Sequence, residues 1–477
     1  MPSLAAVRTA SASHGLALAI GLLAAGLAAS LLYSPAPIVL VAGAAASLYF
    51  LSRPYELLLV MVFLIPFNFV FRVGPIPVAA ELLKVLAWIP FLFYLRGRGL
   101  QFKTSKYNKW FAVVGGLLLL SIFRAHDLPF TLKESVRLGS NIGLCYLVLN
   151  LVDSREKVLQ VFRVLTVSTF FVACYGFYQF AIKDFGALFW IVNPRLETSL
   201  SPGRFTFWPW RNRITSVLTS EMELGHYFNL CLPVGVLLWL TERRKRIGST
   251  WLLMVLSMLA GLLLTFTFGA WLSLAVTTGC FVLLLSRGQR WKMALAGVLV
   301  LSLATAVLAF GPLRPLVEAK AFEGGAGSLA WDFATRFDIW TLALNVFTSH
   351  PLLGVGYGNF SSLSAGALEW LTQEWVPSGS SPHDVYLYLL SELGLVGFVT
   401  LVFVFVNTIR SDMSIRAMPE LGYVGLALAF ALTTVLIGGF SDDSALYGPH
   451  TSYVFWLFIG ISEAVRNLAP ASPGTGG

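Results

Sequence analysis

Two polar segments of the sequence contain arginines that stand apart from the chain's clusters of basic residues. Residues 183–223 hold Arg204, Arg211 and Arg213, and residues 312–382 hold Arg336. A guanidinium group binds an oxyanion through two parallel hydrogen bonds and stabilises negative charge as it develops. These arginines therefore predict an anion-binding site. For Arg336 an alternative is a helix-surface ion pair, since Asp332 precedes it by four residues.

A histidine stands where the second segment ends. His383 follows Ser381-Pro382 and begins an apolar run that predicts a continuous helix over residues 385–407. Neutral histidine accepts a proton near physiological pH, so His383 could act as a base, or it could merely cap the helix. Glu392 is nine residues further on, on the opposite helical face and about 13 Å deeper. It is therefore a separate buried acid, with a helix-to-helix hydrogen bond as the alternative to a functional role.

The elements that must position these residues are membrane helices. The chain of 477 residues is 57% hydrophobic and 12% charged, with a mean hydropathy of +0.75, which excludes an ordinary soluble domain. Apolar runs of spanning length recur across residues 15–465, and we count about 14 of them. The first run, over residues 15–33, is followed at once by another, so we interpret it as a retained span rather than a signal peptide.

Basic residues orient the predicted bundle. They cluster in alternate loops, which assigns those loops to the cytoplasm. The three main clusters lie within residues 96–109, 243–246 and 287–292. Because the number of predicted spans is even, both termini are assigned to the cytoplasm as well. The net charge of +9 does not predict nucleic-acid binding, because the basic residues are not interleaved with stacking aromatics. All four cysteines fall in apolar runs and are interpreted as small apolar residues.

The two polar segments are left on the outer side. Within the second, residues 329–350 carry one apolar stripe at helical spacing, which predicts a helix along the outer membrane interface. The glycine-rich string over residues 354–358 predicts a turn rather than a phosphate loop, because no P-loop lysine follows. Asp442 and Asp443 could hold a metal ion, but solvation is the expected state of short loop acids.

An ordered set of motifs resembles the O-antigen ligase and O-antigen polymerase superfamily. It extends over roughly residues 166–462 and comprises Arg213-Ile-Thr-Ser-Val217, Arg336-Phe-Asp-Ile-Trp340, His350-Pro-Leu-Leu-Gly-Val-Gly-Tyr-Gly-Asn-Phe360, His383-Asp-Val-Tyr-Leu387 and Glu392-Leu-Gly-Leu-Val-Gly397. The resemblance implies an all-α, GT-C-like polytopic bundle. We accordingly divide the chain into N-terminal membrane helices (1–165), a catalytic region (166–465) and a cytoplasmic tail (466–477).

The resemblance also implies a function. A member of this superfamily transfers an oligo- or polysaccharide from undecaprenyl diphosphate to an acceptor at the periplasmic face of the bacterial inner membrane, without a metal, cofactor or nucleotide sugar. The acceptor expected first is lipid A core, as for an O-antigen ligase; a growing glycan, as for a polymerase, and a protein are alternatives. A transporter of a lipid-linked saccharide or small anion is the alternative of another class, and a structural scaffold is the weakest.

The resemblance then assigns roles to individual residues. Arg213 and Arg336, with Arg211, are the expected diphosphate clamp, and His383 is the expected base that takes the acceptor's proton. Arg204, Asp384 and Glu392 are possible supporting residues; Asp384 stands where the family usually has Asn or Ser. The family commonly has the sequence Ser-Arg-Gly-Ala at the outer end of a middle membrane span. Here that sequence is Thr267-Phe-Gly-Ala270, so Phe268 stands in place of the arginine, and Arg211 or Arg204 could substitute for the missing basic group.

Overall fold

The computed structural model describes most of the chain as α-helices. The described residues are 49–67, 71–73, 76–78, 84–186, 188–189, 213–285, 329–364, 381–418 and 421–468. The predicted spans before residue 49 therefore lie outside the described residues, as do Arg204 and Arg211. Of the predicted tail, residues 466–468 are the last residues of a helix, and residues 469–477 lie outside the described part. The helical class is confirmed. The single sheet within the described ranges is an antiparallel pair, β1 (Phe71–Val73) and β2 (Ile76–Val78).

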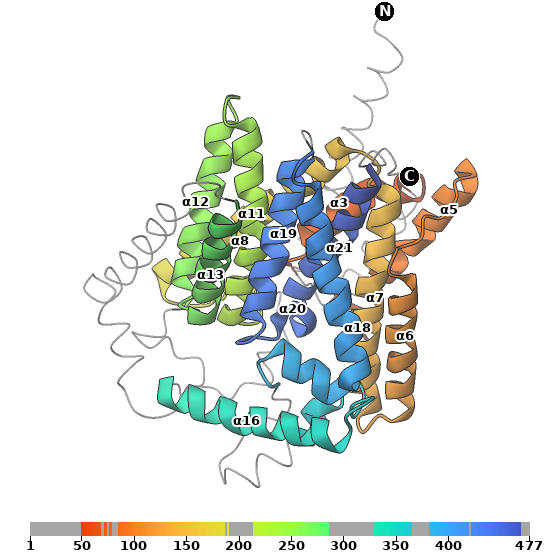
Figure 1. Cartoon of the computed structure of the whole chain (residues 1–477). Helices are drawn as coiled ribbons and strands as arrows, with labels where there is room; N and C mark the ends of the chain where they lie inside the picture. Colours follow the sequence, from red (N-terminus) through yellow and green to blue (C-terminus); the bar gives the residue numbers. More distant parts are fainter. Residues whose placement is uncertain are drawn as a thin grey trace, which may run out of the picture.

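The helices form one bundle with an additional helix lying across one end (Figure 1). The N-terminal half holds α3 (Pro54–Leu64), α5 (Trp88–Arg98), α6 (Asn108–Phe123), α7 (Leu128–Leu151) and α8 (Arg155–Ile182). The other half holds α11 (Glu221–Glu242), α12 (Gly248–Leu264), α13 (Phe268–Leu285), α16 (Leu329–Ser349), α18 (Val385–Ile415), α19 (Gly422–Gly438), α20 (Ser444–Tyr447) and α21 (Thr451–Leu468). Of these, α16 lies across the lower end of the bundle, as predicted for residues 329–350.

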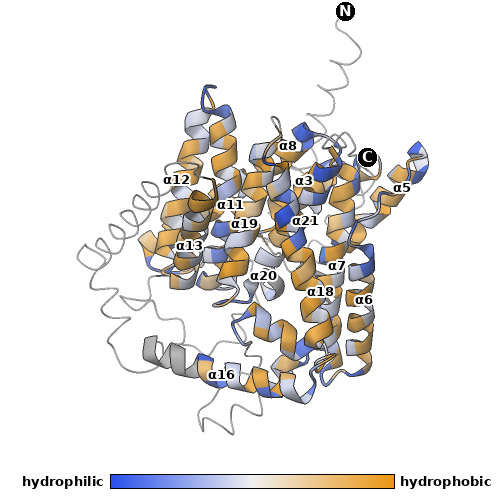
Figure 2. Ribbon diagram, in the orientation of Figure 1, coloured by the Kyte–Doolittle hydropathy of each residue, from blue (hydrophilic) through white to orange (hydrophobic). Residues whose placement is uncertain are grey.

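The membrane assignment follows from the composition of the helices. Among the described residues, four helices, namely α8, α11, α13 and α18, are long and apolar enough to span a bilayer, and α3, α6, α12 and α19 are shorter apolar helices. Large apolar side chains are exposed along the outer faces of α6, α8, α12, α13 and α18, while polar residues gather at the ends of the helices (Figure 2). The protein is therefore a multi-pass membrane protein, because lipid tails solvate such a belt and water does not.

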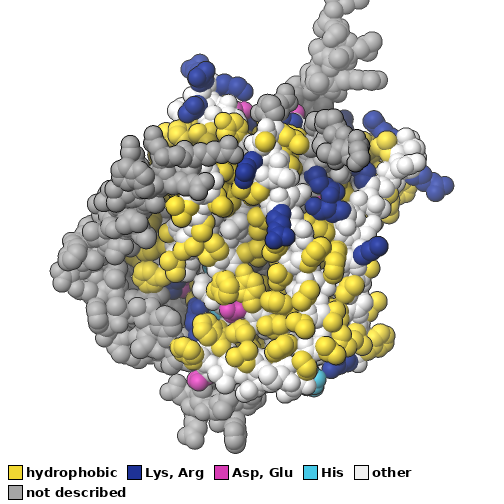
Figure 3. Space-filling model, in the orientation of Figure 1, with side chains coloured by type: hydrophobic (Ala, Val, Ile, Leu, Met, Phe, Trp, Pro, Cys, Tyr) yellow, Lys and Arg dark blue, Asp and Glu magenta, His cyan; other side chains and the backbone are white. Residues whose placement is uncertain are grey.

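The two ends of the bundle differ in charge. Lys and Arg side chains are concentrated in the upper half of the face drawn in Figure 3. The basic turn between α11 and α12, over residues 243–246, lies at the end opposite to α16 (Figure 1). This separation agrees with the predicted orientation, in which α16 is on the outer side; the sidedness itself stays a prediction.

Helix α21 forms the centre of the bundle. Its residues from Thr451 to Val465 are all buried, and it packs closely against α7. Gly460 makes this approach possible, since a Cβ there would come within 2.9 Å of the Cα of Cys145. The cysteines within the described residues are free thiols, and Cys145 and Cys231 are buried among apolar side chains. The predicted apolar role of the cysteines agrees with this packing.

Helix α18 is not the continuous helix that the sequence predicts. Gly394 has φ 63° and ψ −167°, which breaks the helix and leaves backbone groups on both sides without helical partners. The glycine-rich turn after α16 takes those bonds: Val355 donates to the Ser391 carbonyl at 3.0 Å, and Gly356 donates to the Glu392 carbonyl at 2.8 Å. In return, Leu395 donates to the Pro351 carbonyl at 2.8 Å. The predicted turn is thus confirmed, and it fixes the end of α16 to α18 at the Gly394 break.

Candidate functional site

The candidate site is built around the first turn of α11, at the end of the bundle that α16 covers. Ser220 caps this helix by accepting a hydrogen bond from the backbone N–H of Glu223, and Glu221 and Glu223 supply acidic side chains in the same turn. Two of the predicted clamp arginines reach this turn. Arg213 pairs with Glu221, and a guanidinium nitrogen of Arg336 lies 3.9 Å from the sulfur of Met222. The structure thus brings Arg213 and Arg336 together from sequence positions more than a hundred residues apart.

Arg213 is held at the junction between α12 and α13. Its Nη1 lies 2.6 Å from the Glu221 carboxylate, and its Nε donates to the Thr265 carbonyl at 2.8 Å. Its Nη2 donates to the Thr267 hydroxyl at 3.3 Å, directly before Phe268. Arg213 therefore supplies a basic group beside Phe268, the position for which Arg211 and Arg204 were the predicted substitutes. An anion that approaches Arg213 must compete with Glu221.

Arg336 joins α16 to the loop between α19 and α20. Its Nη1 donates to the backbone carbonyl of Ser441 at 2.7 Å. Within the described part of the chain, no carboxylate forms an ion pair with Arg336; the side chain of Asp332, its predicted alternative partner, is outside the described residues. A guanidinium group that is partly buried and bound to a neutral carbonyl retains donors for an anion.

His383 adopts a left-handed backbone conformation with φ 51° immediately before α18. The indole Nε1 of Trp340 donates to the Pro382 carbonyl at 2.9 Å, which ties this segment to α16 one turn after Arg336. The helix is capped by Asp384, whose carboxylate accepts hydrogen bonds from the N–H groups of Tyr386 and Leu387, each at 2.8 Å. Capping, the alternative role considered for His383, therefore belongs to Asp384. Burial raises the pKa of Asp384, and the nearby Arg336 opposes this shift.

Two loop acids that were expected to be solvated are buried. Asp442 and Asp443 are 5% and 7% exposed, respectively. Asp442 accepts hydrogen bonds from the backbone N–H and the hydroxyl of Ser444, and its charge acts on the buried His226 of α11. Oδ2 of Asp443 has no hydrogen-bond partner within the described residues. Burial raises the pKa of Asp443 to about 6, and the nearby imidazole of His383 lowers it in part. The expectation that these two acids are solvated was wrong, because the loop that carries them folds inward between α11 and α18.

A second buried pair ties α11 to α21. The carboxylate of Glu223 accepts a hydrogen bond from the backbone N–H of His450 at 2.9 Å and lies 3.0 Å from its Nδ1. Both side chains are almost fully buried, at 2% and 0% exposed. Neither residue is among the site residues predicted from the sequence, because 227 positions separate them. The only sequence signal was their polarity at the ends of otherwise apolar runs.

Glu392 is a structural residue of the same end of the bundle. It is fully buried, its Oε1 accepts a hydrogen bond from the backbone N–H of Phe360 at 3.1 Å, and its Oε2 accepts one from the Tyr447 hydroxyl. It thereby holds the turn after α16 and helix α20 against α18. The predicted alternative for Glu392, a buried hydrogen bond between elements, agrees with these contacts.

Removing the Glu392 carboxylate should destabilise this junction. Glu392→Leu would leave the N–H of Phe360 buried without an acceptor, so we expect a loss of at least about 2 kcal/mol of stability. Glu392→Gln, which retains an acceptor oxygen, is the matched control. The check is the midpoint of thermal unfolding of the purified chain in detergent; equal midpoints for the leucine and glutamine variants would contradict the structural role.

One family model matches part of the chain. Residues 253–402 match the family model described as O-antigen ligase. The match covers 150 of the 477 residues and shows that this part of the chain is similar to O-antigen ligases. The matched residues lie within the predicted catalytic region and include Arg336, His383, Asp384 and Glu392, whereas Arg213, Asp443 and His450 lie outside them. No curated protein matches the chain.

The domain match supports a membrane glycosyltransferase of the O-antigen ligase or polymerase type. Within the described ranges, no group of three or more His, Cys, Asp or Glu side chains is arranged to hold a metal ion. What the site does contain is a pair of arginines, an imidazole at the end of a helix, and a buried carboxylate near that imidazole. These groups can bind an oxyanion and accept a proton.

Proposed function

We propose that the protein is an O-antigen ligase. In this proposal it transfers a saccharide from undecaprenyl diphosphate to the lipid A core at the periplasmic face of the inner membrane. The matched family description and the location of the site, at the end of the bundle opposite to the basic turn, support this assignment. Polymerisation, with a growing glycan as acceptor, would use the same donor-binding residues.

The observation that carries the proposal is the convergence of Arg336 and His383 on one loop. Arg336 donates to the carbonyl of Ser441, and His383 acts electrostatically on Asp443 two residues later. A guanidinium group on α16 and an imidazole just before α18 thus both act on residues 441–443. This is the arrangement that a transfer reaction needs, since the anionic leaving group and the acceptor hydroxyl meet at one carbon atom of the sugar.

The chemistry follows from these positions. Arg336 and Arg213 bind the diphosphate of the donor and stabilise the charge that develops as the bond between the sugar and the phosphate oxygen breaks. The acceptor hydroxyl attacks the anomeric carbon, and His383 takes its proton. The products are the glycosylated acceptor and undecaprenyl diphosphate, which leaves with the electron pair. Asp443 stabilises the imidazolium that forms on His383.

Reconstitution tests this proposal directly. The purified chain is placed in liposomes with an undecaprenyl-diphosphate-linked glycan and lipid A core, and products are resolved by gel electrophoresis. We expect a glycan-bearing lipid A core that Arg213→Ala, Arg336→Ala and His383→Ala each diminish. Arg244→Ala, at the opposite and basic end of the bundle, is the control. Wild-type product with all three site variants would refute the assigned roles, and longer glycans on the donor lipid alone would indicate a polymerase.

The pH dependence of transfer should report Asp443. Its raised pKa means that the carboxyl is protonated below about pH 6 and ionised above it. Only the ionised form stabilises a charged His383, so we expect transfer to increase between about pH 5 and about pH 7. Asp443→Asn should lower transfer and move or flatten this rise. An unchanged pH profile in the asparagine variant would exclude Asp443 from the reaction.

A further inference from the structure

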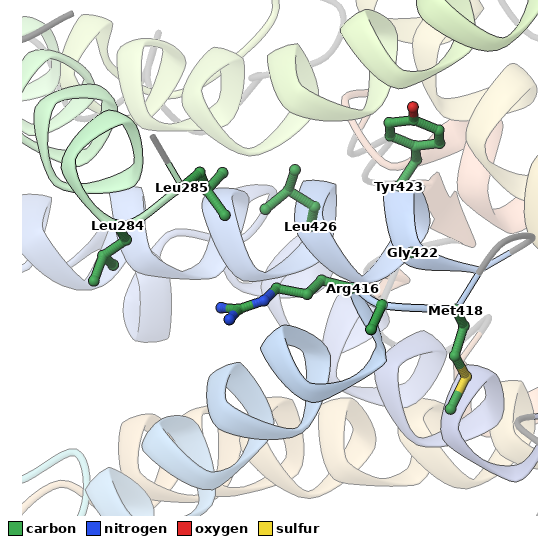
Figure 4. A pocket seen from close by; sticks show the side chains of 8 residues that line it. Leu284, Leu285, Arg416, Met418, Gly422, Tyr423 and Leu426 are labelled. Carbon is green, nitrogen blue, oxygen red and sulfur yellow. The ribbon is translucent and has the colours of Figure 1, made fainter. Parts of the chain in front are cut away.

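A separate cavity lies at the basic end of the bundle. It has a volume of about 440 Å³ and is bounded by the last turn of α13, the end of α18 and the first turns of α19 (Figure 4). The residues that line it include Leu284, Leu285, Arg416, Tyr423 and Leu426. None of these residues belongs to the candidate transferase site, which is at the opposite end of the helices.

The lining combines apolar surface with one cation. Leu284 and Leu285 are 62% and 41% exposed, and Tyr423 is 61% exposed. The Arg416 side chain extends beneath Leu426 toward the side on which these two leucines lie (Figure 4). Arg416 is exposed, and it takes part in no ion pair with another described residue. The cavity therefore presents a guanidinium group beside surface that water solvates poorly.

The position of Arg416 indicates the kind of occupant. It is the C-cap of α18, at the same end of the bundle as the basic turn at residues 243–246. The basic end of a membrane protein faces the leaflet rich in anionic lipids. A phospholipid has both features that the cavity would bind, a phosphate that accepts two parallel hydrogen bonds from a guanidinium group and acyl chains that pack on leucines. A free anion would bind the guanidinium group but would leave the exposed leucines without an apolar partner.

We propose that this cavity is a binding site for an anionic phospholipid. The headgroup phosphate lies on Arg416, the acyl chains lie along Leu284, Leu285 and Leu426, and the Tyr423 hydroxyl lies at the level of the headgroup. The site would anchor the α18 to α19 turn in its leaflet. It is independent of the proposed transferase activity.

Native mass spectrometry of the whole purified chain tests this proposal. The detergent-solubilised protein is titrated with phosphatidylglycerol or phosphatidylcholine of identical acyl chains. We expect preferential retention of phosphatidylglycerol, and about tenfold weaker binding of it by Arg416→Gln. Arg410→Gln is the matched control, because Arg410 is an exposed arginine of the same helix that does not line the cavity. Leu426→Trp, which fills the cavity without changing charge, should weaken binding as well.

Three outcomes would overturn the proposal. The first is equal retention of the two lipids by the wild-type chain, which would mean that the headgroup charge is not recognised. The second is equal loss in Arg410→Gln and Arg416→Gln, which would indicate non-specific attraction to the basic end. The third is unchanged binding by both Arg416→Gln and Leu426→Trp, which would locate the lipid elsewhere.

Discussion

Replacing Arg336 with alanine is expected to lower glycan transfer by at least about a hundredfold, the usual effect of removing a group that stabilises developing charge. The guanidinium group is held by the Ser441 carbonyl and has no described carboxylate partner that would neutralise it. Arg336→Lys keeps the charge but loses the planar pair of donors, so we expect only partial recovery. The measurements are kcat and the donor KM of the reconstituted enzyme.

A positional role for Arg336 must be separated from a chemical one. Arg336 and Trp340 both tie α16 to neighbouring loops, the first through Ser441 and the second through the Pro382 carbonyl. Trp340→Phe removes the second tie without removing a charge and is the matched control. If Trp340→Phe lost as much transfer as Arg336→Ala, the arginine would act by holding α16 in place.

His383→Asn should reduce transfer by about a hundredfold or more, because asparagine cannot accept the acceptor's proton. Asparagine is the informative substitution because the backbone at His383 has φ 51°, a left-handed conformation that asparagine tolerates better than alanine. We expect a lower kcat with little change in the donor KM, since the diphosphate is bound by the arginines. His383→Ala should combine this loss with backbone strain.

A control for His383 is available within the same turn. Asp384→Asn keeps the side-chain oxygen that caps α18, so its thermal stability should stay close to that of the wild type. Transfer at the wild-type rate in His383→Asn would remove the base from the proposed mechanism. A loss of stability in His383→Asn without a change in the rate per folded molecule would make His383 a structural residue.

Patterns within a few residues determined the class of protein and several members of the site. Hydropathy established a helical membrane protein, the apolar stripe predicted α16, and short ordered motifs selected Arg336 and His383. These features are local, and each motif holds its residues within one element or at its end. The span count of about 14 and the GT-C-like arrangement stay predictions, because the described helices do not cover the whole chain. The sidedness of the membrane also stays a prediction, because it rests on the distribution of charge alone.

Tertiary structure decided which residues face one another. The break at Gly394 depends on a turn some forty residues earlier that takes the freed hydrogen bonds, and a sequence periodicity cannot reveal such a partner. Asp443 had the composition of a solvated loop acid, yet the inward fold of its loop buries it near His383. The packing of α11 against α12 and α13 places Arg213 beside Phe268 and pairs it with Glu221. Glu221 then competes with an anion for the guanidinium group. Residue types therefore determined the available chemistry, while long-range packing decided which charges are buried, paired or left available to bind an anion.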